Sequence, residues 1–150
     1  TAFGFVGDVT VTTVESGVTV NLTGVSAASA VGSVSAAPIT VFAVTVANPG
    51  SGNKYYIDSV QQATLTLNEG SIYRFDQSDS SNGSPTHPLR FSTISDGTWG
   101  GGSEYTTGVT TNGTPGTAGA YTQIEVAIGA PTLYYYCSNH SGMGGQANTP

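Results

Sequence analysis

The first third of the chain alternates β-branched apolar residues with hydroxyl residues. The pattern occurs at residues 9–12, 18–23 and 39–46. Because successive side chains of a strand point to opposite faces, this period of two predicts strands with one buried face. Residues 24–35 interrupt the pattern with small side chains that cannot fill a core alone, so we expect this segment to pack against another surface.

A cluster of turn-forming residues at 48–53 leads into a part of the chain with a different texture. Most aromatic residues follow it, and short apolar runs recur between turn signals. They predict strands at 55–60, 63–67, 71–76, 88–94, 121–128 and 132–137, with a long Gly-, Ser- and Thr-rich excursion at 95–120 that holds a short strand near Tyr105. In the last strand, Leu133 and Tyr135 should share the face of Cys137. This series of short strands predicts an all-β Greek-key β-sandwich.

The same turn cluster is the predicted domain boundary. Residues 1–48 contain only two charged side chains, Asp8 and Glu15. We expect them to form a β-rich, low-complexity N-terminal arm, or a small β-domain, that serves assembly. Residues 54–150 should form the sandwich domain.

Composition agrees with the all-β prediction and argues against several functions. Valine outnumbers leucine by 15 to 5, and charged residues make up only 8% of the chain, which suits sheets better than helices. No apolar run approaches the roughly 20 residues of a membrane-spanning helix. No leader pattern stands at the start, so we expect a signal peptide to be absent or already removed. The net charge of −6 argues against nucleic acid and against membrane insertion or an anionic membrane surface.

The sequence shows no known catalytic pattern. It has no nucleophile elbow, phosphate-binding loop or paired catalytic carboxylates. Only two histidines are available for acid–base chemistry, and a single cysteine excludes an intramolecular disulfide. We therefore do not expect an enzyme.

Residues with soft or borderline metal-ligating atoms fall into one pattern. Cys137, His140 and Met143 follow each other at intervals of three at the end of a predicted strand, and His87 stands at the start of another. A thiolate, two imidazoles and a thioether favour copper, in a trigonal Cys-His-His arrangement with a weak axial methionine. Zinc is the alternative ion, since it also accepts cysteine and histidine. The sequence thus predicts a metal site made of His87, Cys137, His140 and Met143.

Two segments resemble parts of the small blue-copper proteins, the cupredoxins. Thr-Leu-Tyr-Tyr-Tyr-Cys-Ser-Asn-His-Ser-Gly-Met at 132–143 is similar to their last strand and ligand loop, and His-Pro-Leu-Arg-Phe at 87–91 to the segment with their first histidine ligand. The resemblance covers about residues 54–145. It implies an eight-stranded Greek-key sandwich with a type 1 copper site, in which the same four residues would be the ligands.

A second resemblance covers most of the chain. The runs at 22–35, 55–58, 63–70, 73–80 and 102–109, together with the Tyr-rich ending, resemble parts of structural proteins from marine tailed bacteriophages, especially cyanophages. This resemblance implies an extracellular fibre, tail or capsid-surface component of a virion. Its partners would be copies of itself, other virion proteins and a host-surface receptor.

Two functions therefore stay open. The first is a virion structural protein in which the metal would tie distant segments together. The second is a secreted or periplasmic blue-copper electron carrier. Three features depart from the carrier pattern. Two are additional segments, residues 1–48 and the long excursion at 95–120. The third is the set of polar neighbours of His140, because carriers usually expose an apolar patch around that histidine.

Overall fold

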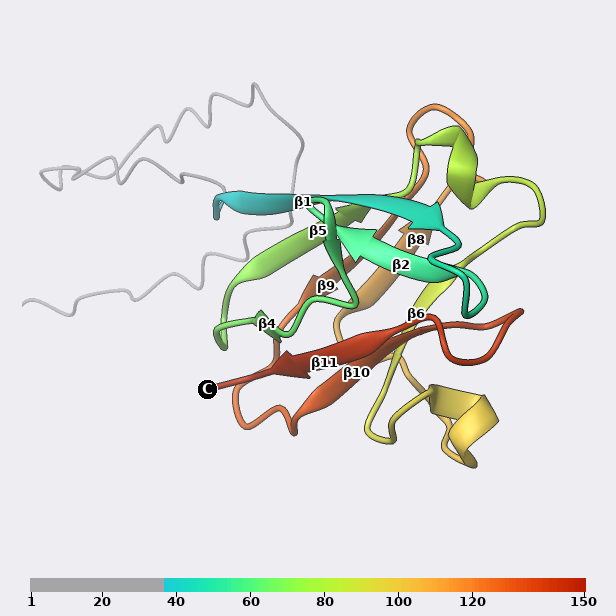
Figure 1. The fold of residues 1–150 in the computed structure, drawn as a ribbon. Coiled ribbons are helices and arrows are strands. Elements are labelled where there is room, and N and C mark those ends of the chain that lie inside the picture. Colours follow the sequence, from blue (N-terminus) through green and yellow to red (C-terminus); the bar gives the residue numbers. More distant parts are fainter. Residues whose placement is uncertain (1–36) are drawn as a thin grey trace, which may run out of the picture. The chain divides into compact units, whose positions relative to one another are not determined.

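The computed structural model describes residues 37–150, which form two mixed β-sheets (Figure 1). The six-stranded sheet has the order β3-β2-β1-β5-β9-β8 and consists of β1 (Ile39–Ala47), β2 (Lys54–Ile57), β3 (Val60–Gln61), β5 (Ile72–Asp76), β8 (Val109–Asn112) and β9 (Tyr121–Glu125). The five-stranded sheet has the order β4-β11-β10-β6-β7 and consists of β4 (Leu65–Thr66), β6 (Leu89–Ser92), β7 (Glu104–Tyr105), β10 (Leu133–Cys137) and β11 (Gly145–Asn148). Two short 3-10 helices, η1 (Ser80–Asn82) and η2 (Gly97–Gly100), lie in the connections.

The predicted all-β class is confirmed for residues 37–150, which contain no α-helix. The two sheets are consistent with the predicted β-sandwich. Neighbouring strands are antiparallel except for the pairs β1–β5 and β4–β11, which are parallel. Within the same residues, no helix has the length and apolar character that crossing a bilayer requires.

Strand β1 belongs to the six-stranded sheet, although the sequence assigned it to the N-terminal arm. It pairs antiparallel with β2 and parallel with β5. The predicted boundary at 48–53 is therefore the connection between β1 and β2. The change in composition at this point does not mark a break in the sheet, because composition does not encode strand pairing. The rest of the predicted arm, residues 1–36, lies outside the described residues.

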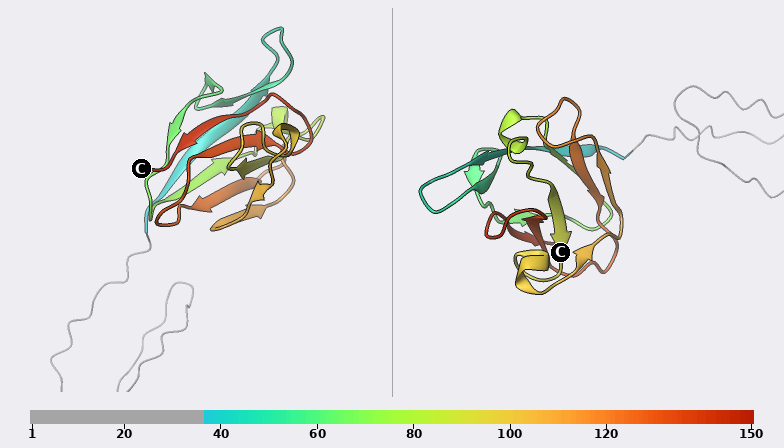
Figure 2. Two further views of the ribbon diagram at one scale, coloured as in Figure 1. Left: turned by 90° about the horizontal axis from the view of Figure 1, so that it is seen from below. Right: turned by 90° about the vertical axis from the view of Figure 1, so that its right-hand side faces the viewer.

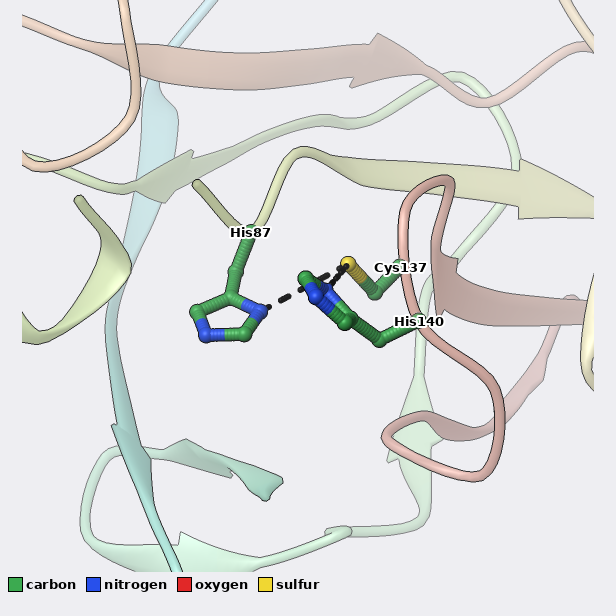
Figure 3. A group of neighbouring side chains, drawn as sticks. All are labelled: His87, Cys137 and His140. Atoms are coloured by element: carbon green, nitrogen blue, oxygen red, sulfur yellow. Dashed lines mark hydrogen bonds between the residues drawn. The ribbon is translucent and has the colours of Figure 1, made fainter. Parts of the chain in front are cut away.

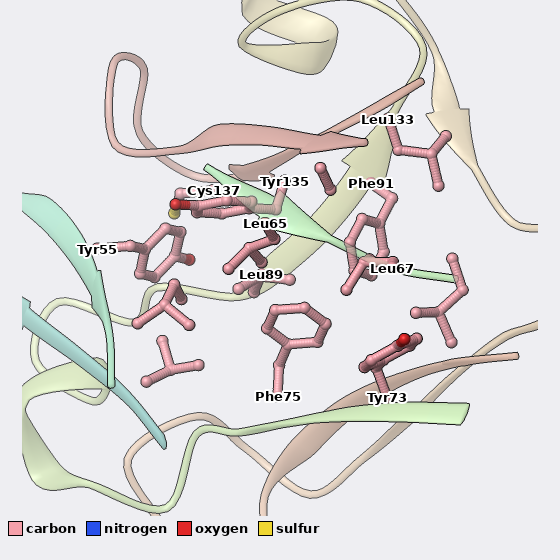
Figure 4. Close-up of a cluster of buried hydrophobic side chains, with 14 of the residues drawn as sticks. Tyr55, Leu65, Leu67, Tyr73, Phe75, Leu89, Phe91, Leu133, Tyr135 and Cys137 are labelled. Carbon is pink, nitrogen blue, oxygen red and sulfur yellow. The ribbon is translucent and has the colours of Figure 1, made fainter. Parts of the chain in front are cut away.

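The core lies between the two sheets, and Phe75 of β5 is near its centre (Figure 4). Its ring centroid is 5.3 Å from that of Phe91 in the opposite sheet, in an edge-on arrangement, and 5.3 Å from that of Phe42 in β1. On β10, Leu133, Tyr135 and Cys137 are all fully buried in this core, as their shared face predicts. The apolar core thus extends to the cysteine.

Tyr136 is buried on the opposite face of β10 because η2 covers it. Figure 2 shows the yellow η2 segment beside the five-stranded sheet. A Cβ at Gly97 would overlap the Tyr136 ring, and Gly97 has φ +56, a conformation that favours glycine. The first part of the predicted excursion at 95–120, the η2 segment, therefore folds back onto the strand that ends in Cys137.

Candidate metal centre

Two adjacent strands bring His87 and Cys137 to the same end of the five-stranded sheet. Cys137 at the end of β10 pairs with Leu89 at the start of β6, and His87 lies two residues before Leu89. The backbone N–H of Ser138 donates to the carbonyl oxygen of Pro88 at 3.1 Å, which continues the pairing beyond β10. Register thus places two residues side by side that are fifty positions apart in the sequence.

The backbone of His87 is hydrogen-bonded at both its N–H and its carbonyl group. The N–H donates to the carbonyl oxygen of Asn82 at 2.8 Å. The carbonyl oxygen accepts from the Tyr55 hydroxyl at 2.8 Å and from Nε2 of Gln77 at 2.7 Å. Burial, and secondly the nearby Cys137, hold the pKa of Tyr55 well above its usual value, so its hydroxyl remains a donor. These hydrogen bonds fix the position of the His87 backbone, from which the imidazole side chain extends.

Replacing Gln77 tests this support. Gln77 is 1% exposed, and its Oε1 also accepts from the N–H of Leu89 at 3.1 Å. We expect Gln77→Leu to lower the free energy of unfolding by about 1–3 kcal/mol, because buried polar groups lose their partner. Urea unfolding of the metal-free protein measures the loss. Gln61→Leu, at an exposed position, is the control and should change stability by less than about 0.5 kcal/mol; equal losses would contradict the assigned role.

His140 and Met143 lie in the loop that joins β10 to β11. His140 is half-buried, whereas Met143 is fully buried in the core that also contains Cys137. Gly142 has φ +70, which allows the chain to turn between them. Gly144 passes so close to the carbonyl of Tyr135 that no Cβ fits there. Close packing of this glycine-rich loop against β10 brings both side chains back toward the cysteine.

The four predicted residues are clustered, and three of them converge closely (Figure 3). Sγ of Cys137 lies 3.8 Å from Nδ1 of His87 and 3.6 Å from Nδ1 of His140. One ligand atom from each of these three residues lies within 4.8 Å of the other two. The two imidazole rings have centroids 4.6 Å apart and are tilted by 53°. This arrangement is compatible with a metal site.

The sulfur–nitrogen distances fit two ligands on one ion. With metal–sulfur bonds of about 2.3 Å and metal–nitrogen bonds of about 2.0–2.1 Å, an angle of about 110–125° at the ion separates sulfur from nitrogen by roughly 3.6–3.9 Å. The observed 3.8 and 3.6 Å fall within this interval. Both histidines present the same nitrogen, Nδ1, so the donor set fits an ion without a change of ring orientation.

Burial keeps His87 in the form that binds a metal. The side chain is 1% exposed, and desolvation lowers its pKa, with a further decrease caused by the neighbouring His140. The neutral imidazole retains a lone pair for a metal. Nε2, on the other side of the ring, lies 3.3 Å from Nδ2 of Asn53 in the β1–β2 connection. Metal-binding histidines are commonly oriented by such a partner on the second nitrogen.

The lowered pKa of His87 predicts a stability that falls in acid. Above the unfolded value of about 6.5 both states are neutral at this residue, and the shift contributes nothing. As the pH falls below that value, the unfolded chain takes up a proton more readily than the folded one, so stability decreases by at most about 1.4 kcal/mol per pH unit. Urea unfolding of the metal-free protein between pH 8 and pH 5 measures the slope. His87→Asn should reduce it, and an unchanged slope would contradict the prediction.

Trp99 lies beside the cluster, and the sequence did not predict this position. Trp99 on η2 donates from Nε1 to the carbonyl oxygen of Cys137 at 3.0 Å, and it remains 52% exposed. Trp99 is the only tryptophan of the chain, and this rarity marks it as a residue to consider. Nothing in the glycine-rich sequence around it indicates that η2 folds back onto β10.

Comparisons with known proteins add no relative. No family model matches the chain, and no curated protein matches it. Among residues 37–150, His87, Cys137 and His140 form the only group of three or more histidine, cysteine or acidic side chains close enough to hold an ion. The function therefore has to be inferred from this cluster.

Proposed function

We propose that this domain binds one copper ion through Nδ1 of His87, Sγ of Cys137, Nδ1 of His140 and the thioether of Met143. The observation that carries the proposal is the convergence of both Nδ1 atoms on the cysteine sulfur, at 3.8 and 3.6 Å. One thiolate, two imidazoles and a weak thioether are the donors of type 1 copper sites. A bound copper ion would supply a one-electron Cu(I)/Cu(II) couple.

The donor set supports copper over zinc. Structural zinc sites use cysteine, histidine and carboxylate ligands, whereas thioethers favour the softer Cu(I). Met143 is fully buried, so its sulfur is shielded from water. His87 and Cys137 are positioned by β6 and β10, and little reorganisation would be needed to admit an ion.

Metal competition tests the choice of ion. Metal-free protein is mixed with equimolar copper and zinc, and native mass spectrometry counts the ions retained. We expect one copper per chain. In Met143→Leu, which removes the sulfur at similar volume, the share of zinc should rise. Preferential retention of zinc by the unmodified protein would contradict the proposal.

We further propose that the domain is a structural component of a virion surface, where copper would staple the start of β6 to the β10–β11 loop. The resemblance to structural proteins of marine tailed phages supports this proposal. It implies self-association, contacts with other virion proteins and a host-surface receptor. A metal that binds only the folded chain adds its binding free energy to stability, which suits a chain whose single cysteine cannot form an intramolecular disulfide.

The alternative proposal is a secreted or periplasmic electron carrier. The observation that favours it is the exposed Trp99, whose indole is hydrogen-bonded to the backbone of Cys137. Its side chain is 52% exposed and thus offers an apolar surface close to Cys137, which a redox partner could contact.

The oligomeric state of the full chain distinguishes the two settings. We expect multi-angle light scattering of residues 1–150 to give the mass of several 15.1 kDa chains per particle, because the virion function requires an assembly segment. A chain without residues 1–36 serves as the control and should contain fewer chains per particle. A compact monomer of the full chain would favour the carrier.

A further inference from the structure

We propose that Lys54, Gln62 and Asp96 form a clasp around Gly142 that positions Met143, and that the clasp thereby sets how strongly the Met143 thioether would bind copper. The inference rests on the copper site proposed above and deepens it. It concerns three polar side chains that come from separate parts of the chain and that the proposed ligand set does not include.

Two oppositely charged side chains hold the two ends of Gly142. Nζ of Lys54, at the start of β2, donates to the carbonyl oxygen of Gly142 at 2.6 Å. The N–H of Gly142 donates to Oδ1 of Asp96, in the residue before η2, at 2.8 Å. Hydrogen bonds to charged groups are stronger than neutral ones. The residue before Met143 is therefore held on both sides.

Gln62 and the backbone of β2 extend the clasp past the methionine. Nε2 of Gln62 donates to the carbonyl oxygen of Gly144 at 2.6 Å and lies 3.4 Å from that of Gly142. The N–H of Tyr55 donates to the carbonyl oxygen of Met143 at 3.0 Å. Three consecutive carbonyl groups of the loop thus have partners from outside the loop.

Packing gives this side of the loop little other support. Gly142 is exposed, and a hollow of about 330 Å³ borders the segment from Gly142 to Gly145, with Gln62 and Asp96 among its walls. No side chain fills that hollow, so on this side the clasp fixes the backbone at Gly142, whereas Gly144 is held by its packing against β10. The clasp also uses Lys54, the only lysine in the chain.

The position of Met143 depends on this backbone more than the positions of His87 and Cys137 do. His87 is fixed by β6 and its hydrogen bonds, and Cys137 by β10. The axial ligand tunes the potential of a type 1 copper site, and groups behind the ligands set how they are presented. Loosening the clasp should therefore change the contact that Met143 would make with a bound copper ion, while leaving the two strands intact.

The test variant is Lys54→Met combined with Asp96→Gly. Asp96 has φ +59, so glycine removes the carboxylate at a position whose backbone glycine adopts without strain. Lys54→Arg is the conservative variant that should retain the clasp. Arg74→Met is the matched control, because it removes a cation from β5, where the guanidinium contacts Gln123 and Tyr121 and not the loop.

Two measurements test whether the clasp positions Met143. In metal-free protein, hydrogen exchange of residues 138–145 should be about tenfold faster in the double variant than in the Arg74→Met control, as expected when charged hydrogen bonds are lost. In copper-loaded protein, the reduction potential and the intensity ratio of the two thiolate-to-copper bands should change, and both should be unchanged in Lys54→Arg.

Unchanged exchange, or faster exchange with an unchanged spectrum and potential, would overturn the inference. A wild-type protein without a thiolate-to-copper band would instead refute the proposed copper site. The band in the unmodified protein thus separates failure of the clasp from failure of the site.

Discussion

Cys137→Ser is expected to abolish the stabilisation that copper gives to this domain. If free copper exceeds the dissociation constant a thousandfold, binding to the folded state alone adds about 4 kcal/mol to the free energy of unfolding. Serine has no thiolate and leaves two imidazoles and a thioether, so the gain should nearly vanish. Denaturant unfolding of wild type and variant, each with and without copper, measures it.

The metal-free pair corrects for the direct cost of the substitution. Cys137 is fully buried, and replacing its thiol by a hydroxyl destabilises the core by itself. The predicted effect is the difference between the copper-dependent gains of the two proteins. Ser138→Ala, next to the cysteine, is the control and should retain the full gain. The same gain in Cys137→Ser and wild type would contradict the role of the thiolate.

Phe75→Ala should be the most destabilising single core substitution among those that leave the metal cluster intact. Phe75 is fully buried, and its ring lies within 5.3 Å, centroid to centroid, of both Phe42 and Phe91. Truncation of a buried phenylalanine costs about 3–5 kcal/mol, through lost apolar burial and the cavity left behind. Urea unfolding of the metal-free protein measures the decrease in the free energy of unfolding.

Ile128→Ala is the control for this core prediction. Ile128 is 81% exposed, so its truncation should change stability by less than about 0.5 kcal/mol. A loss below about 1 kcal/mol for Phe75→Ala would mean that the two sheets do not pack through this ring.

Local patterns were sufficient to predict much of the fold. Alternation in residues 71–76 predicted β5 to within one residue, because a half-buried strand requires that period. The same reasoning placed Leu133, Tyr135 and Cys137 on one buried face. The chain has only one cysteine, one methionine and two histidines. All four fall into one pattern of metal ligands, and this pattern identified the four clustered residues.

Features that depend on long-range pairing were not predictable in this way. β11 has the sequence Gly-Gln-Ala-Asn, which carries no strand pattern, and it forms because β10 and β4 lie on either side of it. β8 lies in the excursion at 95–120 and pairs with β9. The clasp combines side chains from three separate segments with loop carbonyls, and no local sequence pattern encodes such contacts.

The visible absorption spectrum of the purified protein, before and after addition of copper(II), is the most direct test of the proposed copper site. We expect an intense thiolate-to-copper charge-transfer band in the wild-type protein and its loss in Cys137→Ser. A protein that stays colourless after copper is added, or a band that survives in Cys137→Ser, would contradict the proposed site.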